Sequence, residues 1–142
     1  MTSEASAASV PPLPKSGPMT QFFWDAVNAR RLEILRCTSC RHFVHYPRPL
    51  CDRCQGEDLS PVEVSGRGTL HAWTVVMQAF HPYFVDKIPY TLAVVELVEE
   101  PGLRMTTNIV DCAEDDLKLG MPVKVAFTEV APGVVLPMFR PA

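Results

Sequence analysis

Residues 36–55 read RCTSCRHFVHYPRPLCDRCQ and contain four of the five cysteines of the chain. Cys37 pairs with Cys40, and Cys51 with Cys54, in two Cys-x-x-Cys turns that ten residues separate. Such a turn lets two thiolates bind one ion while backbone N–H groups point at the sulfurs. Two turns complete the tetrahedral Cys₄ shell of a structural zinc site. The stretch therefore predicts one zinc ion bound by these four side chains.

Other uses of the paired cysteines are disfavoured to different degrees. Disulfides are uncommon in a cytosolic protein, and a redox motif would need only one pair. A rubredoxin-like iron site stays open, because four thiolates also bind iron. His42 and His45 lie between the turns, and with four cysteines in register we expect them at the surface or in packing. A filled Cys₄ shell leaves no open position, so the predicted metal site is structural and not catalytic.

Toward the N-terminus, residues 19–35 (MTQFFWDAVNARRLEIL) have the pattern of one amphipathic helix. At 100° per residue, Phe23, Val27 and Ile34 lie on a single stripe that we expect to pack on the rest of the protein. The preceding residues 1–18 are small, polar and rich in proline, which predicts a disordered leader or an extended arm.

Two further aromatic residues do not fit on this stripe. Phe22 and Trp24 flank it, so either the helix is buried on two sides or one side awaits another protein. We take Phe22 and Trp24 as candidate residues of a protein interface.

After the cysteines, the chain carries five segments rich in valine, threonine, leucine and aromatic residues, which indicate strands. They are residues 68–77, 90–99, 103–110, 122–130 and 134–139. Residues 113–119 (AEDDLKL), between the third and fourth, predict one or two helical turns. This order fits a small closed barrel of OB type, with a five-stranded sandwich as the alternative. We expect a mainly β protein with a zinc ribbon over residues 36–60 and an OB-fold domain over 61–142.

Composition and charge argue against two classes of protein, the disordered proteins and the nucleic-acid coat proteins. Of the 142 residues, 47% are hydrophobic and 20% are charged, which excludes a wholly disordered chain. The net charge of −3 argues against a general nucleic-acid coat protein. The distribution is uneven, because six arginines stand against two acidic residues between Arg30 and Arg53. From Cys54 onward, six basic residues stand against twelve acidic ones.

The sequence contains no recognisable catalytic constellation. It has no glycine-rich phosphate loop, no G-x-S-x-G elbow, no H-E-x-x-H and no paired acidic motif. Cys112 has no neighbouring histidine in sequence, so we expect a buried inert thiol. No apolar run reaches the length of a membrane span, and the first residues do not form a secretion signal. We expect a cytoplasmic protein that is not an enzyme by itself.

The order of the motifs resembles a family of zinc ribbon plus OB-fold proteins, first catalogued as a domain of unknown function and regarded as acyl-CoA-associated. The similarity covers about residues 19–140. It lies in the cysteine pairs together with S-G-R-G-T-L-H-A-W from Ser65, P-Y-T-L-A-V-V-E-L from Pro89 and L-G-M-P-V-K-V-A-F from Leu119. One departure is that Arg41 and Gln55 stand where many zinc knuckles have glycine.

This resemblance implies the small subunit of a complex with a thiolase-fold protein. Such partners include thiolases, hydroxymethylglutaryl-CoA synthases and thiolase-like aldolases that act on steroid or aromatic acyl-CoA. The large subunit would carry the catalytic groups, and the small one would help to bind acyl-CoA. In this sequence zinc would then be bound by the four paired cysteines.

Acyl-CoA needs cationic groups for its phosphates and an apolar channel for its pantetheine arm. The candidate residues for these contacts are Arg41, Arg48, Arg53, Tyr83 and Tyr90. Both tyrosines belong to the loop 78–90, whose aromatic side chains are equally consistent with simple covering of the barrel. The alternative function is nucleic-acid binding, which zinc ribbons and OB-folds also perform.

Overall fold

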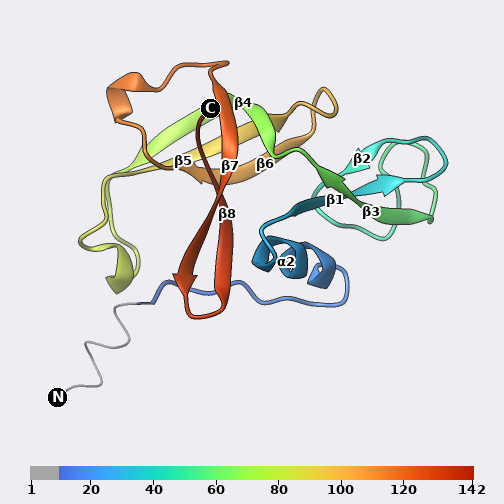
Figure 1. The fold of residues 1–142 in the computed structure, drawn as a ribbon, viewed down its shortest axis with the longest axis horizontal. Helices are drawn as coiled ribbons and strands as arrows, with labels where there is room; N and C mark the ends of the chain where they lie inside the picture. The colour runs from blue at the N-terminus through green and yellow to red at the C-terminus, as the bar shows by residue number, and fades with distance from the viewer. Residues whose placement is uncertain (1–9) are drawn as a thin grey trace.

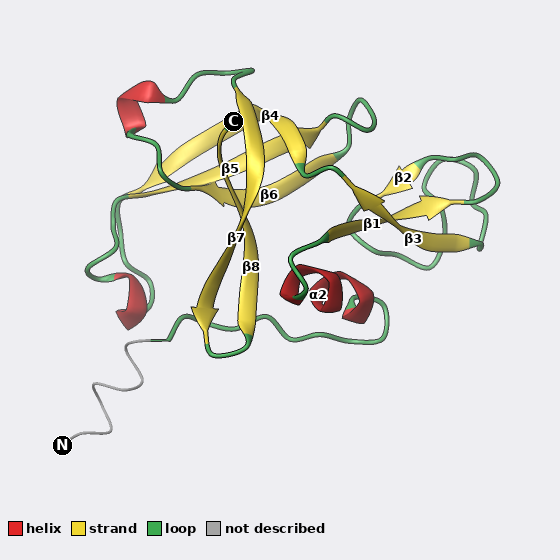
Figure 2. Cartoon of the chain, viewed as in Figure 1, coloured by secondary structure: helices red, strands yellow, loops and turns green. Residues whose placement is uncertain are grey.

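The computed structural model describes residues 10–142, so part of the expected leader, residues 1–9, lies outside the described residues. One short helix precedes a small three-stranded ribbon, and a five-stranded barrel follows (Figures 1 and 2). The predicted mainly β architecture is confirmed. Residues 11–17 have no regular secondary structure, although Pro11 is buried.

The helix α2 (Gln21–Asn28) is shorter than the predicted 19–35. It ends in a Schellman arrangement, in which Arg31 N–H donates to Ala26 O and Arg30 N–H to Val27 O. Arg30 has a φ of 63° at the position that usually holds glycine. Because the residue there is arginine, the sequence carries no glycine signal for the end of the helix.

The end of the predicted helix is instead strand β1 (Leu32–Cys37). Leu32 and Ile34 point into the main core with Phe23 and Val27, whereas Leu35 and Cys37 belong to a second core inside the ribbon. A strand buried on both faces shows no alternation, and so its sequence cannot be told from a helix by periodicity. The predicted stripe is correct in that these residues are buried, but Ile34 reaches the core from a strand.

The ribbon sheet has the strand order β2–β1–β3, with β2 (Phe43–Val44) and β3 (Leu59–Val64) both antiparallel to β1. The ribbon sheet therefore extends to Val64, past the expected boundary at residue 60.

The barrel is closed in the order β4–β5–β6–β8–β7, which decides for the OB type against the sandwich. All neighbouring pairs are antiparallel except β6 with β8. Its strands are β4 (Arg67–Val76), β5 (Tyr90–Leu97), β6 (Arg104–Ile109), β7 (Pro122–Ala131) and β8 (Val134–Pro141). These bounds lie within two residues of the five predicted segments. The predicted helical turns are the 3₁₀ turn η2 (Glu114–Asp116).

Two glycines of the G-R-G motif allow the barrel to close. Gly66 has a φ of +77°, and a Cβ there would lie 2.4 Å from Val125 Cγ1. Gly68 pairs with Leu97 on one side and Val123 on the other, and its Cβ would lie 2.5 Å from Glu96 O. A side chain at Gly68 would meet the backbone of the neighbouring strand, whereas one at Gly66 would meet the Val125 side chain and would also require a left-handed backbone.

Side chains also tie the helix and ribbon to the barrel. Glu100, in the turn after β5, accepts a hydrogen bond from Phe43 N–H (3.3 Å) and lies 2.8 Å from His42 Nδ1. Thr106 N–H on β6 donates to the Tyr46 hydroxyl oxygen at 2.9 Å. Asn28 at the end of α2 accepts a bond from a backbone N–H of β8. The ribbon is thus fixed against one end of the barrel.

Replacing Gly68 by alanine is expected to destabilise the protein by roughly 2 kcal/mol or more, because backbone on the neighbouring strand cannot yield to the added methyl group. Urea denaturation of the purified protein measures the change. Gly17→Ala is the control, since nothing lies within 4 Å of a Cβ at that position. Equal stability of the two variants would contradict the close-approach argument.

Candidate functional site

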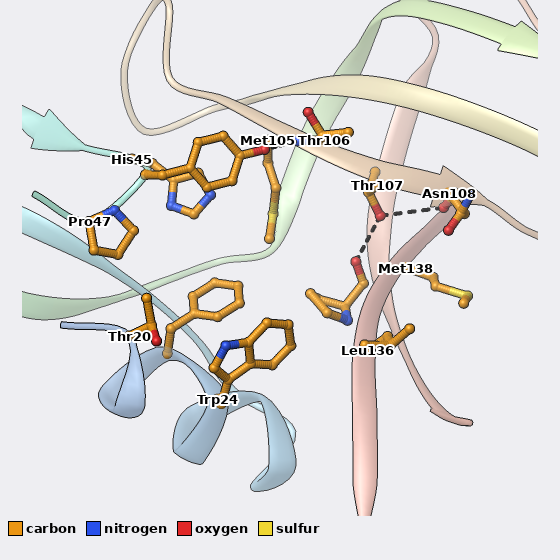
Figure 3. Close-up of a pocket in the computed structure, with 13 residues that line it drawn as sticks. Thr20, Trp24, His45, Pro47, Met105, Thr106, Thr107, Asn108, Leu136 and Met138 are labelled. Carbon is orange, nitrogen blue, oxygen red and sulfur yellow. Dashed lines mark hydrogen bonds between the residues drawn. The ribbon is translucent and has the colours of Figure 1, made fainter. Parts of the chain in front are cut away.

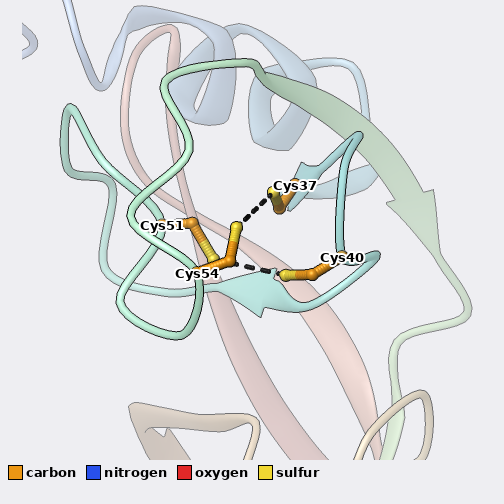
Figure 4. Close-up of side chains that lie close together, drawn as sticks. All are labelled: Cys37, Cys40, Cys51 and Cys54. Atoms are coloured by element: carbon orange, nitrogen blue, oxygen red, sulfur yellow. Dashed lines mark hydrogen bonds between the residues drawn. The ribbon is translucent and has the colours of Figure 1, made fainter.

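The four paired cysteines converge on one point in the ribbon (Figure 4). Their sulfur atoms all lie within 4.8 Å of one another, with Cys37 Sγ 3.5 Å from Cys54 Sγ and Cys40 Sγ 3.6 Å from Cys51 Sγ. Sulfurs around a tetrahedral zinc, at Zn–S distances of about 2.3 Å, are roughly 3.8 Å apart. The donor set and its spacing therefore fit one tetrahedral metal ion.

The two turns have matching backbone geometry despite the missing glycines. Arg41 and Gln55 adopt the left-handed region, with φ of 69° and 63°. Their N–H groups donate to the carbonyl oxygens of Cys37 (3.0 Å) and Cys51 (2.9 Å). The knuckle conformation that usually requires glycine is thus kept by two long polar residues, at the cost of some backbone strain.

Backbone amides favour the thiolate form of the first cysteine of each turn. The N–H of Cys40 is the main cause that lowers the pKa of Cys37 to about 6. In the other turn, the N–H of Cys54 has the same effect on Cys51, whose pKa is also lowered. Since metal ligands bind as thiolates, these amides prepare the sulfurs for a cation.

The histidines between the turns are separate from the sulfur cluster. His42 lies between the carboxylates of Asp52 (3.1 Å) and Glu100 (2.8 Å), where it links ribbon to barrel. His45 stacks near Phe23 and Tyr46, with ring centroids 5.7 and 4.1 Å away. Their expected packing roles agree with these positions.

A largely apolar cleft of about 240 Å³ lies where α2, the ribbon and the barrel meet (Figure 3). The helix contributes Phe23 and Trp24, and the ribbon contributes His45 and Tyr46. Strands β6 and β8 form the far wall. The remaining lining residues are Thr20, Pro47, Met105, Thr106, Thr107, Asn108, Leu136, Pro137 and Met138. Sequence reasoning did not find this cleft, because its walls come from four segments far apart in the chain.

His45, a residue of the cleft wall, carries a buried nitrogen whose hydrogen-bonding capacity is unused. His45 Nε2 is buried and has no hydrogen-bond partner among the described residues. Burial lowers the pKa of His45 to about 4, so the imidazole is neutral at pH 7. A neutral imidazole offers a hydrogen bond to a polar group that enters an otherwise apolar space.

The predicted acyl-CoA residues fall into two groups that the fold does not bring together. Arg41, Arg48 and Arg53 lie on the ribbon and are exposed, and Arg48 Nε is 3.4 Å from Tyr46 O at the cleft. Tyr83 lies in the β4–β5 loop and Tyr90 begins β5 at the end of that loop, which Figure 1 shows at the opposite side of the barrel from the ribbon. Both tyrosines pack against Phe84, at centroid distances of 5.0 and 5.2 Å, and line no part of the cleft.

The other predicted residues lie as follows. Phe22 and Trp24 are both half-buried and pack against the main core. Cys112 is half-buried, and desolvation together with the charge of Asp116 raises the pKa of its thiol. That shift disfavours a nucleophilic thiolate. None of the helices in the described part of the chain is long and apolar enough to cross a membrane.

Two protein-family models match this chain, one over the ribbon and one over the barrel. The family model described as "ChsH2, rubredoxin-like zinc ribbon domain" matches residues 24–60. The model described as "ChsH2, C-terminal OB-fold domain" matches residues 61–128. A "DUF35 domain-containing scaffold protein" of Methanocaldococcus jannaschii is 32% identical over 109 residues, which are 75% of each chain. The chain belongs to the ChsH2 (DUF35) family.

A solved structure called "Ltp2-ChsH2(DUF35) aldolase" contains a chain of this family with 38% identity and a TM-score of 0.81. The match covers 90% of this chain and 98% of that one. A longer relative in Thermomonospora curvata, named "Probable enoyl-CoA hydratase alpha subunit", is 37% identical over 98% of this chain. The chain spans only 42% of the length of that relative.

The buried imidazole predicts a loss of stability in mild acid. The folded protein resists protonation of His45 down to about pH 4, whereas the unfolded chain binds the proton near pH 6.5. Stability should therefore fall as the pH drops below 6.5, by up to about 1.4 kcal/mol per pH unit. His45→Phe should lose this contribution.

The measurement is urea denaturation between pH 7 and 5 for the wild type and His45→Phe. His71→Phe, at an exposed position on β4, is the control that keeps the wild-type slope. The same slope in His45→Phe and the wild type would show that His45 is accessible to protons in the folded state.

Proposed function

We propose that this protein is a non-catalytic subunit that supports a thiolase-fold enzyme acting on acyl-CoA. The observation that carries the proposal is the 38% identity across 98% of the ChsH2 chain in the Ltp2–ChsH2 aldolase structure. Relatives named as scaffold proteins support an accessory role. A relative of 31% identity in Mycobacterium tuberculosis is named as the alpha subunit of a steroid-type acyl-CoA hydratase, "3-oxo-4,17-pregnadiene-20-carboxyl-CoA hydratase alpha subunit".

The ribbon binds one structural zinc ion through Cys37, Cys40, Cys51 and Cys54. Support comes from the spacing of the four sulfurs and from the backbone amides that favour the thiolate forms of Cys37 and Cys51. The ion supplies no catalytic group, because four protein ligands fill its coordination shell. Its contribution is to hold the two turns together.

The cleft beside α2 receives the apolar arm of acyl-CoA. Its walls are largely apolar, which suits the pantetheine arm, and the neutral His45 side chain forms part of one wall. Arg48, next to Pro47 at the cleft, can contact a phosphate in the bidentate manner of guanidinium groups. Tyr83 and Tyr90 have no part in this arrangement. Trp24 lines the cleft on the helix side, where the catalytic subunit would complete the site, and Phe22 flanks it.

Nucleic-acid binding is less well supported than acyl-CoA binding. The arginines on the ribbon would suit it. The barrel suits it less, because no basic residue occurs in residues 72–76 of β4, 90–95 of β5 or 105–109 of β6. A positively charged groove that follows the phosphate backbone is the usual basis of such binding.

Cys40→Ser should reduce bound zinc from one equivalent to a small fraction and lower the melting temperature by several degrees, since ligand binding supplies much of the folding energy of a small ribbon. Elemental analysis and thermal denaturation measure both. Cys112→Ser should keep full zinc, because that thiol is not in the sulfur cluster. A coloured, iron-loaded wild type would favour the rubredoxin-like alternative, and full zinc in Cys40→Ser would contradict the ligand set.

The function itself is tested by co-expression with an Ltp2-type aldolase subunit from the same organism. The chain alone should show no cleavage or formation of carbon–carbon bonds with acyl-CoA, and the purified complex should show it. Parallel titration of the complex with CoA and of the chain with a fluorescent oligonucleotide separates the two candidate functions. Sub-micromolar oligonucleotide binding with a steep salt dependence would overturn the proposal.

A further inference from the structure

Three stretches of the barrel sequence contain no Asp, Glu, Lys or Arg. They are residues 72–85, 89–95 and 105–110. In the fold they cover residues 72–76 of β4, most of the loop that follows, residues 90–95 of β5 and residues 105–109 of β6, and these three strands are neighbours. Charged residues are about a fifth of the whole chain, so an uncharged area of this size is a distinct feature of the surface.

The outward-facing residues of these strands form one patch. Ala72, Val94 and Thr106 lie in one row across the strands, and Thr74, Leu92 and Asn108 in the next. The residues between them along β5 and β6, Ala93 and Thr107, are buried in the barrel. A shallow hollow of about 260 Å³ lies over this patch. We call these two rows of residues the uncharged face.

The β4–β5 loop continues the uncharged face with exposed large side chains. Met77 is 69% exposed, Phe80 82% and Val85 67%. The loop is nevertheless packed, because Tyr83 lies edge-on to Phe84 at 5.0 Å and its N–H donates to His81 Nδ1 at 3.1 Å. Lys87 Nζ lies 4.1 Å above the Tyr83 ring. The aromatic side chains expected to contact acyl-CoA thus hold the loop in shape, and the residues presented to solvent are different ones.

We propose that the uncharged face and the β4–β5 loop are the surface that binds the enzyme subunit, with Phe80 as its central anchor. This rests on the proposed function, which supplies the partner. Large apolar side chains exposed on an ordered loop are typical of protein interfaces.

The chemistry of the surface favours a protein as the occupant. Nucleic acids and anionic lipid surfaces attract clusters of basic residues, and Lys87, whose Nζ lies over the Tyr83 ring, is the one Lys or Arg of the uncharged face and the β4–β5 loop. Strands β4, β5 and β6 are paired side by side, so a partner on their outer face packs on side chains. Thr106 belongs to both the uncharged face and the cleft beside α2, so one partner can cover the face and close the cleft.

The test uses the full chain and the Ltp2-type subunit, with Phe80→Asp and Leu92→Glu as separate variants. Each places a charge on the proposed surface at an exposed position, where folding should be unaffected. The expected result is a dissociation constant at least ~30-fold weaker in each variant, measured by calorimetry or biolayer interferometry. Matched controls are Leu119→Asp (71% exposed) and Val98→Glu (60% exposed), which lie in turns outside the surface.

The outcomes separate the inference from the function on which it rests. Weak binding of both face variants, with normal binding of the controls and unchanged melting curves, supports the surface. Wild-type affinity in Phe80→Asp and Leu92→Glu overturns the surface but leaves the accessory function standing. Self-association of the chain that the two variants abolish would also overturn it, in favour of a second copy. A wild-type chain that forms no complex at all contradicts the proposed function.

Discussion

The convergence of four sulfur atoms on one point is the constraint on which the rest of the structure depends. The ribbon has three short strands and a small core of its own, made by Leu35, Cys37, Val44 and Cys51. Two of these four residues, Cys37 and Cys51, also belong to the sulfur cluster, so the cluster forms part of the ribbon core. A core of this size does not hold three strands together without help. The sulfur cluster therefore fixes the position of β1, which ends at Cys37.

Strand β1 connects the sulfur cluster to the main core and to the cleft beside α2. One of its faces belongs to the ribbon core, and the other carries Leu32 and Ile34 into the main core beneath α2. The cleft takes walls from the helix, the ribbon and the barrel, and it exists only when all three are in place. Glu100 and Tyr46 complete the attachment through hydrogen bonds between ribbon and barrel. A ribbon residue far from the cleft can in this way determine its shape.

Most of the fold could be predicted because its signals are local. The Cys-x-x-Cys spacing, the five apolar segments and the glycines of the G-R-G motif each depend on a few neighbouring residues. The end of the helix was missed for two physical reasons. Arg30 takes a left-handed conformation without glycine, and β1 is buried on both faces and shows no alternation. The predicted acyl-CoA residues were chosen by chemical type alone, and type does not reveal that Arg48 and Tyr83 lie on opposite sides of the barrel.

A closed barrel leaves recognition to side chains, which explains how one fold can serve unrelated functions. The outer face of β4, β5 and β6 presents side chains, because these three strands pair side by side and their backbone groups are engaged within the sheet. An OB-fold with basic and aromatic residues on its outer strands suits nucleic acid. Here the corresponding positions hold Ala72, Thr74, Leu92, Val94, Thr106 and Asn108, and the arginines of these strands, Arg67 and Arg104, lie outside the two rows. The residue types on β4, β5 and β6, more than the fold itself, thus point to a protein partner.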